Sequence, residues 1–243
     1  MLIFIVLFSL FMAGVGFIVT PSNARYLLSG YNTMTDEERK SMDIQGYLRF
    51  FKKFHLVLGA SMLLIGLMIY FIKGPDLAVL SVAVAPIAGY IWFIIKSGKY
   101  ERPVKKNRKL AVWFAVPVLA ATLGLVIFLF FRGWQDNEAV LSENSISLTG
   151  MYGMEIAIDD IDTVYLADKL PKITLRVHGF ATGTILKGKF RCAEHGNVTL
   201  LVNERKSAYV AIFRKKDTPV FYSGKNADEA ALVTVIDQKL RSK

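Results

Sequence analysis

The chain has 243 residues, which is enough for one large domain or two smaller ones. Its hydrophobic content of 53% and its mean hydropathy of +0.38 are too high for an ordinary water-soluble protein. Its 30 Lys and Arg residues against 20 Asp and Glu give a net charge of +10, and its single cysteine excludes an internal disulfide. The composition therefore predicts a basic integral membrane protein.

Four long apolar runs lie in the first half of the chain, at residues 2–19, 54–72, 77–95 and 110–131. None contains an Asp, Glu, Lys or Arg, and each approaches the roughly 20 residues that a helix needs to cross a ~30 Å hydrocarbon core. We therefore expect four transmembrane helices in residues 1–131. No positive charge precedes the first run beyond the N-terminus, so a retained helix is favoured over a cleaved signal peptide.

The Lys and Arg residues cluster in two of the three connections between these runs. The first connection holds Arg25, Arg39, Lys40, Arg49, Lys52 and Lys53, and the third holds Lys96, Lys99, Arg102, Lys105, Lys106, Arg108 and Lys109. Short cytoplasmic loops carry the basic excess, so both connections are predicted inside. The N-terminus and the C-terminal domain are then extracytoplasmic, and the pI of about 9.6 needs no nucleic-acid partner.

The first connection contains LLSGYNTMTDEERKSMD, a polar stretch over residues 27–43. Thr35 is a preferred N-cap and Glu38 follows three residues later, which is the spacing of a capping box. Apolar residues then recur at helical spacing, so we expect an amphipathic helix over residues 35–53 at the inner membrane interface. The preceding SGYNTM carries turn residues and could equally be a plain connector.

The five residues of the GYNTM motif are Gly30, Tyr31, Asn32, Thr33 and Met34. Together with the acidic-then-basic segment and RFFKKF that follow, the motif resembles a family of small bacterial membrane proteins of unknown function, DUF3784. The resemblance covers roughly residues 1–96 and implies three spans in the bacterial cytoplasmic membrane, with the fourth run beyond it. These five residues form a candidate interaction motif.

Residues 132–243 are predicted to form a separate β domain. Short runs rich in Val, Ile, Thr and aromatic residues alternate with turn residues. These runs are SISL, MEIAI, DTVYLA, KITLRVHG, ATGTILKGKFRC, NVTLLVN, AYVAIF and PVFYSG. In KITLRVHG the alternation predicts that Ile173, Leu175 and Val177 share an inward face.

A terminal helix is expected after the strands, with Asn226 as its N-cap and an apolar stripe formed by Leu232, Val233, Ile236 and Leu240. Antiparallel strands followed by one amphipathic helix resemble the membrane-attached bacterial pleckstrin-homology-like fold. The predicted fold class is therefore α+β: four transmembrane helices followed by a pleckstrin-homology-like antiparallel β-barrel with a C-terminal helix. A different small β-sandwich is the alternative.

No catalytic residue, cofactor or metal site is predicted, so we expect no enzyme activity. His178 lies on an outward strand face and His195 in a turn, positions typical of solvated histidines. Cys192 and His195 have a metal-like spacing, but one pair cannot supply a four-ligand zinc site, and Cys192 is expected to be a buried thiol. Because no ionisable residue is expected within the apolar runs, a transporter is not expected either.

A pleckstrin-like fold also raises lipid-headgroup binding, because its eukaryotic relatives use basic residues around the first hairpin. Here that hairpin, residues 148–154, contains no Lys or Arg. Lys187, Lys189 and Arg191 alternate along one strand and form a candidate basic surface, although a solvated face is the simpler interpretation.

Two functional classes remain besides headgroup binding. In the first, a non-enzymatic membrane protein binds a protein or peptide through the strand edges of its β domain, in an envelope-assembly, stress or immunity role. In the second, a signalling or scaffold protein works through the cytoplasmic GYNTM loop. The lipid bilayer is an expected partner in both, and the sequence leaves the oligomeric state open.

Overall fold

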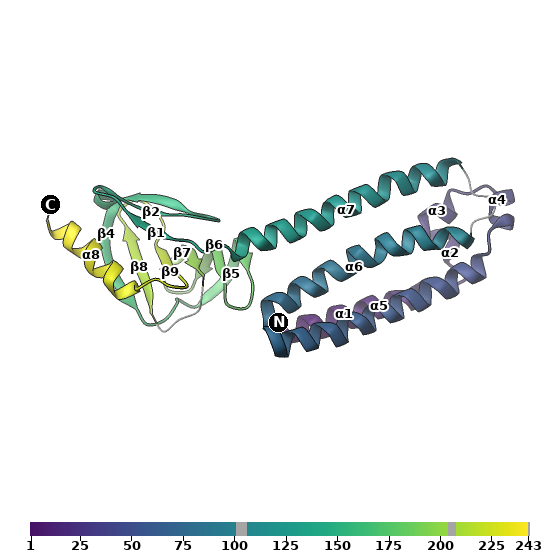
Figure 1. Cartoon of the computed structure of the whole chain (residues 1–243), viewed down its shortest axis with the longest axis horizontal. Coiled ribbons are helices and arrows are strands. Elements are labelled where there is room, and N and C mark those ends of the chain that lie inside the picture. The colour runs from purple at the N-terminus through teal and green to yellow at the C-terminus, as the bar shows by residue number, and fades with distance from the viewer. Residues whose placement is uncertain (101–105, 204–207, 243) are drawn as a thin grey trace. The chain divides into compact units, whose positions relative to one another are not determined.

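The computed structural model describes residues 1–100, 106–203 and 208–242, with the backbone alone at 29–30 and 106–111. Contacts divide the chain into two compact units, Met1–Phe128 and Leu129–Lys243. The boundary falls inside helix α7 (Lys106–Trp134), close to the sequence-based division after residue 131. Figure 1 shows the helices of the first unit and the strands of the second.

The first unit is helical, and three of its helices run side by side (Figure 1). Helix α5 contacts both α1 and α6. Helix α1 is antiparallel to α5, because Ile5 lies beside Gly66 whereas Ser9 lies beside Gly59. The elements are α1 (Leu2–Ile18), α2 (Ala24–Leu27), α3 (Ser29–Asn32), α4 (Asp36–Ser41), α5 (Ile44–Lys73), α6 (Pro75–Ser97) and the 3-10 turn η1 (Gly98–Tyr100).

Three helices in the described part of the chain are long and apolar enough to cross a membrane: Ile44–Lys73, Pro75–Tyr100 and Val112–Trp134. The prediction of four is wrong at the first run, because α1 has only 17 residues. It ends at Ile18, and Pro21 follows two residues after the extended Val19. At 1.5 Å per residue α1 is about 26 Å long, shorter than a ~30 Å hydrocarbon core.

The helix predicted over residues 35–53 is divided into two by successive N-caps. The Thr35 hydroxyl accepts the Glu38 N–H at 3.4 Å and the Glu38 carboxylate accepts the Thr35 N–H at 2.9 Å, which confirms the capping box of α4. The Asp43 carboxylate then accepts the Gly46 N–H at 2.8 Å. This second cap starts α5, whose first turns are therefore the beginning of a long apolar helix rather than a separate interfacial one.

In the part of the second unit that the structure describes, two sheets are followed by helix α8. The three-stranded sheet has the order β1-β2-β3, and the six-stranded sheet has the order β4-β8-β9-β7-β6-β5. All eight predicted strands are present, and β1 is additional. The elements are β1 (Ala139–Leu141), β2 (Ser145–Leu148), β3 (Met154–Ala157), η2 (Ile158–Asp160), β4 (Ile161–Ala167), β5 (Ile173–Ala181), β6 (Leu186–Cys192), β7 (Gly196–Val202), β8 (Tyr209–Arg214), β9 (Val220–Ser223) and α8 (Glu229–Arg241).

The predicted closed antiparallel barrel is wrong. In the described residues no ladder joins the edge strands β4 and β5, and β7 pairs with β9 in parallel. The sheet is nevertheless curled, because only residues 168–172 connect these two edges. Such a connection reaches about 20 Å, whereas six strands lying flat are about 24 Å across. The six-stranded sheet is therefore open and curled.

The two faces of the six-stranded sheet carry separate cores. One face packs against the three-stranded sheet and α8, through a cluster that includes Leu201, Ile212 and Tyr222. The opposite face carries a second cluster that includes Phe190 and Phe221. Both faces of the six-stranded sheet therefore bury apolar side chains, although the sheet does not close into a barrel.

Helix α8 covers the first of these cores, next to β4 and β8 (Figure 1). Its N-cap is Asp228, which accepts the Ala231 N–H at 3.0 Å, rather than the predicted Asn226. The predicted apolar stripe is confirmed: Ile236 is fully buried, and Leu232, Val233 and Leu240 pack around it.

Candidate functional site

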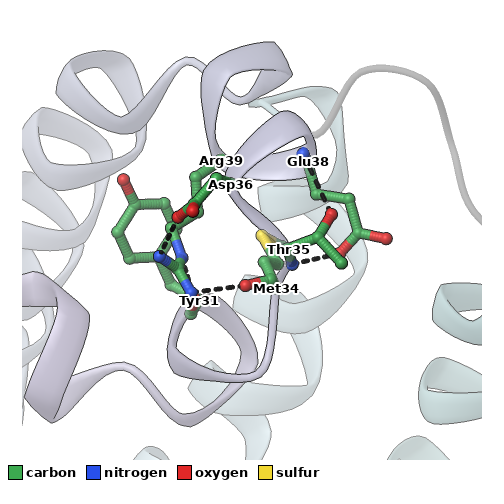
Figure 2. Close-up of polar contacts among 6 residues, drawn as sticks. All are labelled: Tyr31, Met34, Thr35, Asp36, Glu38 and Arg39. Carbon is green, nitrogen blue, oxygen red and sulfur yellow. Dashed lines mark hydrogen bonds and ion pairs between the residues drawn. The ribbon is translucent and has the colours of Figure 1, made fainter.

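The GYNTM segment is held by Arg39, a residue of the following helix (Figure 2). Its guanidinium donates to the backbone oxygens of Tyr31 at 3.3 Å and Met34 at 2.5 Å, and pairs with Asp36 at 2.8 Å. The same group lies 6.0 Å from the centre of the Tyr31 ring. Because only 15% of the Arg39 side chain is exposed, this arginine acts as the internal support of the turn.

The motif residues themselves divide between backbone and surface roles. Gly30 belongs to the short helix α3 and is described by its backbone alone, while Tyr31 and Met34 contribute the carbonyl groups that Arg39 binds. Asn32 and Thr33 are exposed. The structure therefore gives the motif a local folding role, and its role as an interaction motif stays a prediction.

Only two of the three residues in the candidate basic surface of β6 are exposed. Lys189 and Arg191 are exposed, but Lys187 is fully buried and its ammonium group donates to the backbone oxygen of Gln135. Burial lowers the pKa of Lys187 to about 8, although nearby Asp136 opposes this shift. The prediction of three basic residues on one solvated face is wrong because the first lies beneath the start of the domain.

A buried polar cluster fastens the start of the β domain to its sheet. The Asn137 N–H donates to the Asn203 side chain at 2.9 Å, and the Asn203 amide donates to the Ser223 backbone oxygen at 2.8 Å. The Tyr222 hydroxyl donates to the Asn137 backbone oxygen at 3.0 Å, and burial raises the pKa of Tyr222 to about 12. Sequence reasoning missed this cluster, since its members are far apart in the chain.

Strand β5 does not turn its aliphatic residues inward as predicted. Leu175 and Val177 are 53% and 51% exposed, and Ile173 is 36% exposed. Two bulges interrupt the pairing of β5 with β6, so Ile173 lies opposite buried Cys192 whereas Leu175 lies opposite exposed Arg191. Each bulge breaks the simple alternation, and residues 173–178 are exposed on both faces of this edge strand.

These exposed side chains form one mixed surface at the edge of the sheet, which we call the β5 surface: Leu175, Val177, Lys189 and Arg191. His178 lies opposite Lys189 at the border of this surface. Its ring stacks on the Tyr152 ring, with the ring centres 5.6 Å apart. The aliphatic groups therefore lie on the edge strand β5, which has no second neighbour among the described strands, and the cations lie on the adjacent strand β6.

A buried histidine lies in the second apolar run, so the expectation that these runs hold no ionisable residue is wrong. The His55 ring is fully buried, with Nδ1 2.8 Å from the Phe51 backbone oxygen and Nε2 2.8 Å from the Tyr90 hydroxyl. Both ring nitrogens thus have partners, and the second bond joins α5 to α6. A histidine within an apolar run was the signal that could have found this pair.

The Cys192 and His195 pair does not form a metal site. Cys192 is buried as predicted, and burial raises the pKa of its thiol. The His195 ring instead packs against Phe213, with ring centres 5.1 Å apart. Among the described residues, no group of three or more His, Cys, Asp or Glu side chains is arranged to hold a metal ion.

Comparison with known proteins bears on the helical part alone. Residues 6–101, from α1 to the end of η1, match the family described as Domain of unknown function (DUF3784). This match supports the resemblance drawn from the N-terminal sequence, and it covers less than half of the chain. No curated protein and no solved structure matches. The family carries no assigned activity, so function has to be argued from the residues.

Proposed function

We propose that this chain is a non-enzymatic, multi-pass membrane protein whose β domain binds a segment of another protein along the β5 surface. The supporting observation is that Leu175 and Val177 are more than half exposed on an edge strand. An edge strand with exposed aliphatic side chains tends to bind another chain, and proteins usually cover or interrupt such strands. An envelope-assembly, stress or immunity role fits such a module.

The charge of the surface selects the chemistry of the partner. Lys189 and Arg191 flank the aliphatic residues, and the neighbouring acid Glu194 already accepts the Lys172 N–H at 2.9 Å. A segment with carboxylates beside apolar side chains would complement this arrangement. The two bulges break the regular backbone repeat of β5, so side-chain contacts would contribute more than a continuous added strand.

The distribution of basic residues supports an orientation for the spans. Arg49, Lys52 and Lys53 lie near the start of α5, and Lys96 and Lys99 lie near the end of α6. Arg102 and Lys105 lie outside the described residues, as do the side chains of Lys106, Arg108 and Lys109. By the positive-inside rule this end of the helices faces the bacterial cytoplasm, and the β domain, which follows α7, is extracytoplasmic.

Two alternative functions stand beside this proposal. A scaffold role for the cytoplasmic GYNTM loop is favoured by its defined fold around Arg39, and it predicts that the cellular phenotype persists after deletion of residues 135–243. Headgroup binding by the β domain is weakened by the burial of Lys187. The pleckstrin-homology likeness of the domain also stays a prediction, and no binding role is drawn from it.

A photo-cross-linking residue at Val177 of the full chain in its native membrane tests the proposal. We expect one discrete cross-linked protein at Val177 and none at Lys216, an exposed position in the turn between β8 and β9. Charge reversal of Lys189 and Arg191 to Glu should strongly reduce the adduct. The same adduct from both positions, or an adduct that resists charge reversal, would refute a specific β5 surface.

A further inference from the structure

A cavity of about 800 Å³ lies in the helical unit, along one face of α5. Its volume falls within the ~300–1,000 Å³ of typical small-molecule sites. Its lining residues come from α5, from one position of α6 and from η1: Asp43, Gly46, Arg49, Phe50, Lys53, Phe54, Val57, Leu58, Ser61, Trp92, Lys99 and Tyr100. We call this cavity the α5 groove.

One end of the α5 groove is cationic. Arg49, Lys53 and Lys99 are exposed there, and the Lys99 ammonium lies 4.9 Å from the centre of the Tyr100 ring. Asp43 is the single acid in the lining, and its carboxylate already caps α5. Three cations against one engaged carboxylate favour an anionic group at this end.

The remainder of the groove is apolar and aromatic. Phe54 and Trp92 form part of the wall, and Val57 and Leu58 lie further along α5. From Arg49 to the last lining residue, Ser61, a helix rises about 18 Å. That distance is close to half of a ~30 Å hydrocarbon core, which is the depth of one lipid leaflet.

We propose that the α5 groove binds an anionic phospholipid, with its headgroup phosphate between Arg49, Lys53 and Lys99 and one acyl chain along Val57 and Leu58. The order of polarity along α5 matches that of a lipid: charge first, then aromatic side chains, then an aliphatic floor. The groove begins at the basic end of a membrane-length helix, where anionic headgroups of a cytoplasmic leaflet are found. This site is independent of the β5 surface.

Trp92 supplies the probe for a test on the full chain. Trp113→Phe and Trp134→Phe leave it as the only tryptophan. In nanodiscs, phosphatidylglycerol with a brominated acyl chain should quench Trp92 several-fold more strongly than equally brominated phosphatidylcholine at the same mole fraction. Lys53→Gln with Lys99→Gln should lower quenching by phosphatidylglycerol to the phosphatidylcholine level.

A matched pair of charge removals separates the groove from general surface attraction. Lys52 and Lys96 lie at the same end of the helices but outside the lining, so Lys52→Gln with Lys96→Gln should preserve the preference. An equal loss in this control, or equal quenching by both lipids in the parent, would overturn the site. Displacement of the lipid by glycerol phosphate alone would also overturn it, because the acyl chain would then contribute nothing.

Discussion

The helical unit exposes many of its large apolar side chains, whereas the β domain buries most of its own in two cores. In the helices, Trp113, Phe71 and Leu64 are 79%, 74% and 68% exposed, whereas in the β domain Ile212 and Leu200 are fully buried. Large exposed apolar surfaces are rare on proteins that water surrounds. The helical unit is therefore suited to lipid as its solvent and the β domain to water, although one chain carries both.

An aspartate placed in each unit should give the largest contrast. Ile236→Asp puts an unpaired charge into the core beneath α8 and should destabilise the β domain by more than about 4 kcal/mol, enough to remove cooperative unfolding. Leu64→Asp lies on an exposed face of α5, so it should leave β-domain unfolding unchanged and reduce membrane insertion instead. Guanidinium unfolding and membrane fractionation measure the two effects.

A smaller effect should come from the buried lysine of β6. The pKa of Lys187 is about 8 in the fold, below its ordinary 10.5, so between these pH values the unfolded chain holds a proton that the folded chain has released. Stability should therefore rise with pH from about 8 to about 10, by at most ~1.4 kcal/mol per pH unit. Lys187→Met should abolish the rise.

The pH experiment needs a probe in the β domain and a limit at high pH. With Trp92→Phe and Trp113→Phe the remaining tryptophan is Trp134, which lies at the end of α7 in the same compact unit as the β domain and serves as the probe. Above pH 10 the raised pKa of Tyr222 acts in the opposite direction, because the unfolded chain loses a proton that the fold retains. Burial also raises the pKa of Cys192, whose thiol opposes the Lys187 effect between pH 8 and 10, so the difference in slope between the parent and Lys187→Met reports Lys187. An unchanged slope in Lys187→Met would contradict its assignment.

The smallest expected loss of stability comes from removing the N-cap of α4, Thr35. Thr35→Ala should destabilise α4 by about 1 kcal/mol, because the first turn loses its hydroxyl acceptor. Thr33→Ala lies before the cap and should leave α4 intact. Amide exchange of residues 36–41 in detergent distinguishes these outcomes, and equal protection in both variants would count against the cap.

Local signals in the sequence predicted much of the secondary structure. Thr35 and Glu38 have the spacing of a capping box, and both bonds are present. The alternating runs identified eight strands, and the stripe around Ile236 identified the inner face of α8. Each of these features depends on residues within a few positions of one another, so periodicity and cap chemistry are sufficient to predict them.

The features that sequence reasoning missed depend on residues far apart in the chain. No ladder joins β4 to β5 among the described residues, β7 pairs with β9 in parallel, and two bulges interrupt the pairing of β5. Lys187 is buried because the chain around Gln135 lies over it, 52 residues away in sequence. His55 is a different case, because an ionisable residue within the second apolar run is visible in the sequence itself, without any long-range information.

Accessibility of single cysteines in intact cells tests the central claim most directly: the basic ends of the spans face the cytoplasm and the β domain lies on the other side. Lys216 is exposed between β8 and β9 and serves as the probe of the β domain, and native Cys192 is itself buried. A membrane-impermeant thiol reagent should label Lys216→Cys and leave Glu37→Cys, next to the GYNTM segment, unlabelled until the membrane is opened. Labelling of Glu37→Cys with protection of Lys216→Cys would contradict the account.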